Sequence, residues 1–181
     1  REDKSAGAAR EDGFKAGFKA GGMVLEESCI RVSAFTTDSG YEKAKELLKA
    51  RLADHTYLTD EDQSYYLYQL TMDGRSQTGI VACCSIDDYV SGVIKKHENT
   101  REEKELDRIR HIDVMDAQSG PIFLAYRPVK RLKELVALAK EENPLYNFIS
   151  EDGIRHRVWK IGSGDMIKEI REEFEKLPAT Y

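Results

Sequence analysis

The stretch SYYLYQLTMDGRSQTGIVACCSI, residues 64–86, predicts a β-hairpin and decides the fold class. Residues 64–72 are rich in aromatic side chains, and residues 75–86 again have the composition of a strand. Between them stands Asp73-Gly74, a dipeptide that favours a two-residue turn with positive φ at both positions. A second hairpin is predicted where residues 145–150 and 154–161 flank Glu151-Asp152-Gly153. The chain is therefore expected to contain two antiparallel strand pairs.

Helical periodicity accounts for most of the chain around the hairpins. Apolar residues recur at helical spacing over residues 41–52, with Asp38 or Ser39 as the cap, and over residues 129–139. Ser85 caps a short helix that runs to Val93, and residues 167–177 mark a final helix. Short strands are predicted at residues 23–35 and 121–126, and residues 178–181 look like the start of another. This order of elements predicts an α+β fold.

The first forty residues differ from the rest of the chain. Residues 1–22 are rich in Gly, Ala and Lys and contain a GFKA near-repeat, a composition typical of a loose amphipathic helix or of disorder. Residues 41–181 are expected to form one α+β domain that is incomplete at the C-terminus. Because the chain also lacks an initiating methionine, we expect a fragment truncated at both ends.

Composition excludes several classes of protein. The 28 Lys and Arg residues stand against 33 Asp and Glu residues, for a net charge of −5. A general nucleic-acid binder needs a basic face, so we do not expect nucleic acid as a partner. No apolar run approaches the roughly 18 residues of a membrane-spanning helix, and no signal segment opens the chain. We therefore expect a cytoplasmic protein that does not contact a membrane.

The cysteines and histidines do not predict a metal site. Cys29, Cys83 and Cys84 form no Cys-x-x-Cys pair, and adjacent cysteines on a strand would point to opposite faces. Buried, reduced thiols are the favoured interpretation. The four histidines do not have the spacings of a zinc finger.

The stretch IKKHENTREEKELDR, residues 94–108, contains the candidate active site. Thr100 and Glu103 match a capping box, so a helix is expected to begin at Arg101. His97 and Glu98 would then lie in the loop before the first turn, where free backbone N–H groups and the positive end of the helix dipole attract phosphate. A titratable pair beside an anion site is a candidate for catalysis.

The predicted helix separates its side chains into faces. Projection at 100° per residue places Arg101, Lys104, Arg108 and His111 on one side, whereas Leu106, Ile109 and Ile112 occupy another. Periodicity alone favours a solvated, charged helix. The cap, the preceding His-Glu pair and the basic stripe favour a phosphate site, and both interpretations stay open at this point.

Residues 41–181 resemble the bacterial family called domain of unknown function 1015. The matching motifs occur in one order along the chain and cover about three-quarters of it. They are QSYYLY (63–68), MDGRSQTG (72–79), DDY (87–89), HENTR (97–101) with Lys104-Glu105 and Asp107-Arg108, GPIFL (120–124), Asp152-Gly153, His156 and Trp159.

A second resemblance carries functional information. The order of His-Glu, helix, Pro-Ile strand and a later Asp-Gly-His-His-Arg turn is similar to that of free-serine kinases of the ParB and sulfiredoxin-like superfamily. This resemblance implies a mixed sheet with flanking helices, Glu98 as the base for a serine hydroxyl, and a turn beyond Tyr181 that holds nucleotide phosphates. It also implies ATP or ADP with Mg²⁺ as cofactor.

These observations give each candidate residue an expected role. Glu98 and His97 are the expected catalytic residues, because a carboxylate can orient or deprotonate an alcohol. The expected phosphate- or substrate-binding residues are Thr100, Arg101, Lys104, Arg108 and His156. Glu105 and Asp107 are expected to form internal salt bridges rather than to bind Mg²⁺, and Trp159 to lie in the core.

The expected function is phosphate-centred chemistry on a small metabolite, with phosphoryl transfer on serine or phosphoserine as the specific case. One alternative is a non-catalytic nucleotide-binding or regulatory module of ParB-like fold. Another is a hydrolase of a phosphoester at the same site. The sequence leaves the phosphate donor and the oligomeric state open.

Overall fold

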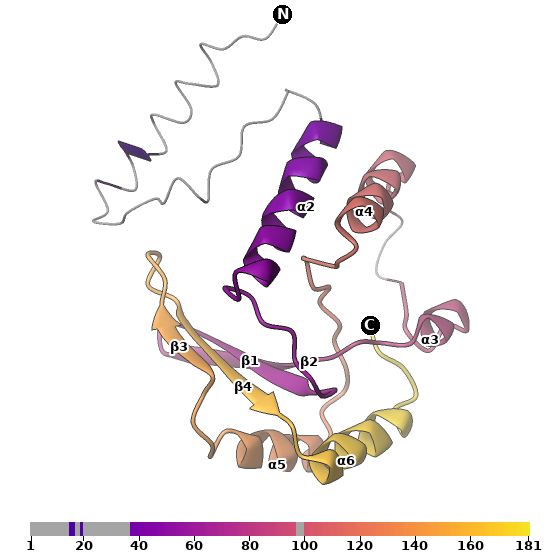
Figure 1. Ribbon diagram of the computed structural model, residues 1–181. Helices are drawn as coiled ribbons and strands as arrows, with labels where there is room; N and C mark the ends of the chain where they lie inside the picture. The colour runs from indigo at the N-terminus through magenta and orange to yellow at the C-terminus, as the bar shows by residue number, and fades with distance from the viewer. Residues whose placement is uncertain (1–14, 17–18, 20–36, 97–99) are drawn as a thin grey trace, which may run out of the picture. The chain divides into compact units, whose positions relative to one another are not determined.

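The computed structural model describes residues 15–16, 19, 37–96 and 100–181, which form two compact units (Figure 1). The helical unit comprises the described parts of residues 1–59 and 100–121, and the sheet unit those of residues 60–99 and 122–181. The strand predicted at residues 23–35 lies outside the described residues, as does most of the Gly- and Ala-rich segment before it.

The described residues of the helical unit include the helices α2 (Thr37–Ala53) and α4 (Glu102–Met115). The prediction of α2 is confirmed, but the helix begins before both of the residues that were expected to cap it. Asp38 lies in its first turn instead, where a carboxylate interacts favourably with the positive end of the helix dipole.

The sheet unit contains a four-stranded antiparallel sheet with the strand order β2-β1-β4-β3. Both predicted hairpins are confirmed. The first joins β1 (Tyr65–Met72) to β2 (Arg75–Val81), and the second joins β3 (Tyr146–Ile149) to β4 (Arg155–Ile161). β2 ends five residues earlier than predicted. The described residues therefore form an α+β fold.

The turn between β1 and β2 has the conformation that its sequence predicts. Met72 pairs with Arg75, and the two residues between them have φ angles of 50° at Asp73 and 76° at Gly74. Positive φ at both positions is the requirement of the mirror-image turn that matches the twist of a hairpin. The turn therefore fixes the register of the β1–β2 pair.

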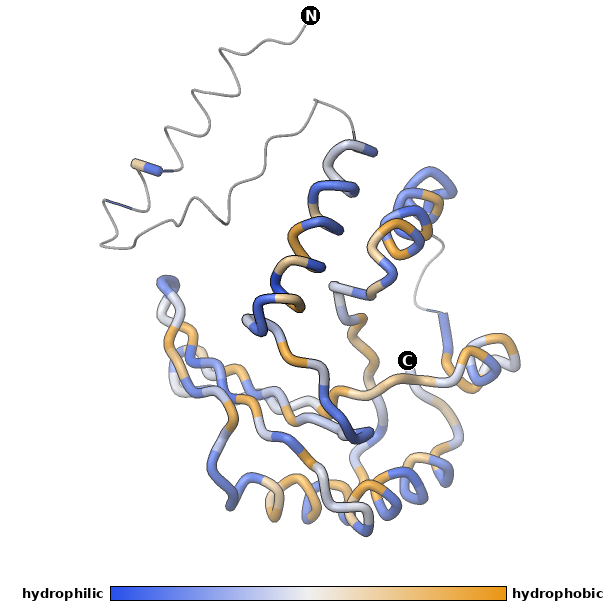
Figure 2. Tube along the Cα trace, viewed as in Figure 1, coloured by the Kyte–Doolittle hydropathy of each residue, from blue (hydrophilic) through white to orange (hydrophobic). Residues whose placement is uncertain are grey.

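Helices α5 (Lys130–Ala139) and α6 (Gly164–Glu175) pack against one face of this sheet. Apolar residues recur along both helices (Figure 2). The core that they form with the sheet consists of Leu67, Leu132, Leu135, Ala139, Trp159, Ile161 and Ile170. The core position predicted for Trp159 is confirmed, since the side chain is 3% exposed and its Nε1 donates to the carbonyl of Glu142 at 3.0 Å.

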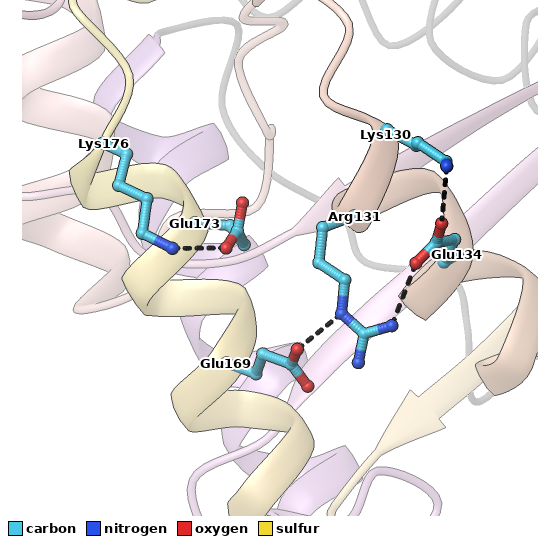
Figure 3. A network of polar contacts seen from close by, with 6 residues as sticks. All are labelled: Lys130, Arg131, Glu134, Glu169, Glu173 and Lys176. Carbon is cyan, nitrogen blue, oxygen red and sulfur yellow. Dashed lines mark hydrogen bonds and ion pairs between the residues drawn. The ribbon is translucent and has the colours of Figure 1, made fainter.

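One ion pair between exposed side chains joins these two helices, and others lie within each helix (Figure 3). The guanidinium of Arg131 on α5 contacts Glu134 one turn later at 3.0 Å and Glu169 on α6 at 2.5 Å. This hydrogen bond to Arg131 lowers the pKa of Glu169. Exposed pairs of this kind contribute little stability, so the apolar core does most to hold the helices on the sheet.

The strand predicted at residues 121–126 is wrong. In this segment Ala125 exchanges both backbone hydrogen bonds with Tyr181, at 2.5 and 2.7 Å, but no strand forms around it. Ile122 and Phe123 are 72% and 79% exposed. One residue pair is not a ladder, and apolar composition alone does not supply the neighbouring strand that a ladder needs.

The prediction of buried cysteines is wrong for the two that the structure describes. Cys83 and Cys84 are both exposed, because β2 ends at Val81 and the chain continues without regular structure to α3 (Ile86–Val90). Partial desolvation raises the pKa of the Cys84 thiol, and the neighbouring Cys83 and Asp88 raise it further. This thiol is therefore held in its protonated, less reactive form.

Among the described residues, no helix is long and apolar enough to cross a membrane.

Candidate functional site

Two places in the chain contain the residues predicted to bind phosphate. The first is the start of α4 in the helical unit, with Thr100, Arg101, Lys104 and Arg108. The second is His156 on β4 of the sheet unit. His97 and Glu98 lie outside the described residues, so their catalytic roles stay predictions.

The capping box predicted at Thr100 is wrong. The helix begins at Glu102, one residue later than expected, and its N-cap is Arg101 in an extended conformation without a side-chain cap hydrogen bond. The carbonyl of Arg101 accepts from the N–H groups of Lys104 and Glu105, at 2.9 and 3.0 Å. No side chain caps this turn, so its first N–H groups keep the donor capacity that the capping box would have used.

Basic side chains follow the start of α4 along one side. Lys104 and Arg108 are one turn apart, and both are exposed, as is Arg101 at the N-cap. None of the three has an ion-pair partner among the residues that the structure describes. Because guanidinium and ammonium groups are strong donors to phosphate oxygens, this side of the helix has the chemistry of an anion-binding surface.

The next side of α4 packs against α2 through polar groups. The hydroxyl of Tyr41 donates to Asp107 at 2.5 Å, and its ring lies 5.3 Å from that of His111. Arg110 pairs with Asp38 at 2.8 Å. Asp107 thus accepts from a tyrosine instead of forming the predicted salt bridge, and this hydrogen bond is the largest cause of the raised pKa of Tyr41.

This packing reverses the usual orientation of an amphipathic helix. His111 faces α2, whereas the apolar residues Leu106, Ile109 and Ile112 are 58%, 49% and 42% exposed. The contact with α2 holds α4 from its Asp107 side and leaves Lys104 and Arg108 exposed beside it. The basic stripe therefore belongs to an ordered surface of the helical unit.

The loop that leads to His97 is fixed by backbone hydrogen bonds within the sheet unit. The N–H of Lys95 donates to the carbonyl of Thr180 at 2.8 Å, and the N–H of Thr180 donates to the carbonyl of Val93 at 3.1 Å. Ile94 and Thr180 form an isolated parallel bridge, so the strand entry predicted at residues 178–181 pairs at one residue without forming a strand. Lys96 lies over the ring of Tyr89, 5.2 Å from its centroid.

His156 lies in a chain of hydrogen bonds on the sheet face opposite the core. Its Nδ1 is 2.7 Å from the hydroxyl of Tyr68, and its Nε2 is 2.8 Å from Oγ of Ser150. Ser150 donates to Asp152 at 2.5 Å, and this hydrogen bond is the largest cause of the lowered pKa of that carboxyl. The ring of Phe148 stacks on the imidazole at 4.8 Å and 9°.

These contacts assign the protons along the chain. The single hydroxyl proton of Ser150 is directed to the carboxylate of Asp152 and the carbonyl of Ile154 at 3.0 Å, so the Ser150 oxygen accepts from Nε2–H of His156 and Nδ1 accepts from Tyr68. Both ring nitrogens therefore have partners inside the sheet unit. The predicted contact of His156 with phosphate stays a prediction, and it requires one of these partners to be displaced.

Sequence reasoning missed the partners of His156. Ser150 and Asp152 belong to the predicted second hairpin, but Tyr68 is 88 residues away, and only the register of β1 against β4 brings it close. Asp152-Gly153 in the turn is the one local signal that could have indicated a polar contact nearby.

The family comparison agrees with the resemblance drawn from the motifs. The model of the family described as Protein of unknown function (DUF1015) matches residues 25–181. The chain belongs to this family. No curated protein and no solved structure matches the chain. The matched residues include both the start of α4 and the hydrogen bonds around His156. The family description assigns an activity to neither place.

Proposed function

We propose that this member of the family carries out phosphate-centred chemistry on a small metabolite, with phosphoryl transfer to serine, or from phosphoserine, as the specific reaction. The observation that carries the proposal is the stripe of Arg101, Lys104 and Arg108, exposed and without ion-pair partners among the described residues, at an α-helix start that lacks a side-chain cap.

The proposed roles follow from the needs of phosphoryl transfer. The transferred group carries negative charge on its oxygens, and positioned cations together with backbone N–H groups stabilise it. Lys104 and Arg108 supply the cations. Glu98 orients the serine hydroxyl and accepts its proton as the oxygen attacks the terminal phosphorus of the nucleotide. The bond from that phosphorus to its bridging oxygen breaks, and the nucleotide shortened by one phosphate leaves.

The cofactor proposed is ATP or ADP with Mg²⁺. The described residues contain no group of three His, Cys, Asp or Glu side chains able to hold a metal ion. Mg²⁺ usually keeps several waters and binds through one or two carboxylates plus substrate phosphates. A nucleotide complex that brings its own Mg²⁺ is therefore compatible with these residues.

We propose a ParB/sulfiredoxin-like arrangement for the fold as a whole. The described sheet is antiparallel, but the isolated bridge between Ile94 and Thr180 is parallel. The sheet unit therefore contains both directions of strand pairing. This pairing supports the proposed resemblance.

The second candidate function is a nucleotide-binding or regulatory module without catalysis. The observation that favours it is that two carboxylates of the described residues accept hydrogen bonds from hydroxyl groups of the same chain. Asp107 accepts from Tyr41, and Asp152 accepts from Ser150. Both carboxylates thus take part in hydrogen bonds within the chain. A hydrolase acting on a phosphoester at the α4 start would need the same residues as the transferase.

Calorimetry and turnover on the intact protein separate these functions. ATP, ADP and phosphoserine are titrated into the wild type and into Lys104→Ala and Arg108→Ala variants, with Lys133→Ala, an exposed lysine of α5, as the control. If only Lys104→Ala and Arg108→Ala bind several-fold more weakly, the result supports phosphate binding by these two side chains. Equal binding by all three variants excludes that role. Turnover of serine with nucleotide distinguishes the enzyme from the module.

A further inference from the structure

Strand β3 is an edge of the sheet that the described residues form. It pairs with β4 only, among the strands that the structure describes. The sequence of residues 145–149 is LYNFI, and the exposed fractions of its apolar side chains are 53% for Leu145, 59% for Tyr146, 53% for Phe148 and 59% for Ile149. Proteins usually protect an edge strand with charge, proline or a covering segment. Residues 145–149 contain neither a charge nor a proline.

The other edge of the sheet is different. β2 begins with the charged Arg75 and continues with Ser76, Gln77 and Thr78. A charged and polar edge discourages pairing with another strand. Of the two edges, β3 is therefore the one suited to association.

The alternation of hydrogen bonds along β3 shows which of its backbone N–H and C=O groups are not bonded to β4. The N–H of Ser150 donates to the carbonyl of Ile154 at 2.9 Å, and the register pairs Phe148 with His156 and Tyr146 with Val158. Because hydrogen-bonded pairs alternate along an antiparallel ladder, Phe148 and Tyr146 direct their backbone groups toward β4. The N–H and C=O groups of Asn147 and Ile149 therefore point to the free edge. The N–H of Leu145 does not, because it donates to the carbonyl of Val158 at 2.7 Å.

We propose that β3 pairs with β3 of a second copy of this chain, antiparallel and centred on Asn147. In this register each Asn147 faces the partner's Asn147, and their outward N–H and C=O groups exchange two hydrogen bonds. Tyr146 lies opposite the partner's Phe148, and Leu145 lies opposite the partner's Ile149. The two four-stranded sheets join into one of eight strands.

A second copy fits this edge because residues 145–149 are complementary to themselves. The proposed register sets aromatic against aromatic and aliphatic against aliphatic side chains, which are favourable cross-strand pairs. The whole chain carries a net charge of −5, and the acidic residues Glu142, Glu151 and Asp152 lie just outside the segment. Residues 145–149 themselves carry no charge, so the paired segment brings no like charges together. A single sequence thus supplies both sides of the contact.

Sedimentation velocity over a wide range of concentrations tests the proposal on residues 1–181. The wild type should show a monomer–dimer equilibrium. Asn147→Lys and Asn147→Asp each place like charges opposite one another, and each should weaken the dimer by roughly tenfold or more. An equimolar mixture of the two variants should restore it, because lysine then faces aspartate. Gln77→Lys and Gln77→Asp on β2 are the matched controls and should change nothing.

Hydrogen exchange of the wild type tests the same contact without a substitution. The amides of Asn147 and Ile149 should exchange more slowly as the protein concentration rises, whereas that of Phe148, already bonded to β4, should not. A protein that stays monomeric at every concentration overturns the proposal. So does a dimer that persists unchanged in both Asn147 variants, because it must use another surface.

Discussion

The hydroxyl oxygen of Tyr68 lies 2.7 Å from Nδ1 of His156, across the β1–β4 ladder and 88 residues away in sequence. This hydrogen bond connects the first hairpin to the second on the sheet face opposite the core. It also sets the tautomer of the imidazole, because Nδ1 must accept if Tyr68 donates.

Tyr68→Phe should remove this hydrogen bond and leave Nδ1 of His156 without its partner. We expect a loss of about 1 kcal/mol in the free energy of unfolding, the usual net value of one hydrogen bond, measured by urea denaturation. Nitrogen chemical shifts of His156 should report the Nε2–H tautomer in the wild type. Tyr146→Phe, whose hydroxyl has no hydrogen-bond partner among the described residues, is the control. A wild-type Nδ1–H tautomer would contradict the proton assignment.

Gly74→Val should destabilise the protein by about 1 kcal/mol or more, because a β-branched residue resists the φ of 76° that the turn requires. The melting temperature reports the change. Gly79→Val makes the same substitution within β2, where φ is not positive and no atom lies within 4 Å of an added Cβ. It should be neutral or stabilising. Equal effects at the two glycines would show that the turn conformation does not determine the loss.

Glu169→Gln should remove a pH-dependent part of the stability. The hydrogen bond from Arg131 lowers the pKa of Glu169, so its contribution is fully present above the ordinary pKa of a glutamate, about 4.3, and is lost as the pH falls from there through the lowered pKa of the folded protein. Melting temperatures of wild type and variant should therefore differ at neutral pH and converge in acid. Glu175→Gln, without an ion pair among the described residues, is the control. A difference that grows in acid would contradict the assignment.

The parts of the fold that depend on local sequence were predicted. The Asp73-Gly74 turn, the second hairpin and the helices at α2, α5 and α6 follow from turn chemistry and periodicity, which act within a few residues. The wrongly predicted strand at residues 121–126 shows the limit of this reasoning. Its apolar composition is that of a strand, but strand formation depends on a partner that the local sequence does not specify.

The candidate site was predictable only as a list of residue types. The spacing of Lys104 and Arg108 places them on one side of α4 without knowledge of the fold. The start of that helix moved by one residue because Arg101, and not Thr100, adopts the extended N-cap conformation. Periodicity also could not show that Asp107 would bond to Tyr41, since this contact joins two helices that are distant in sequence.

The measurement that tests the central claim most directly is the turnover of serine and nucleotide by the intact protein with Glu98→Gln. The amide keeps the size of the side chain but removes the charge that accepts the proton, so turnover should fall by roughly 10²-fold or more while substrate affinity changes far less. Arg101→Ala should instead raise the apparent KM several-fold. Wild-type turnover by Glu98→Gln would contradict the phosphoryl-transfer mechanism and leave the binding module as the better account.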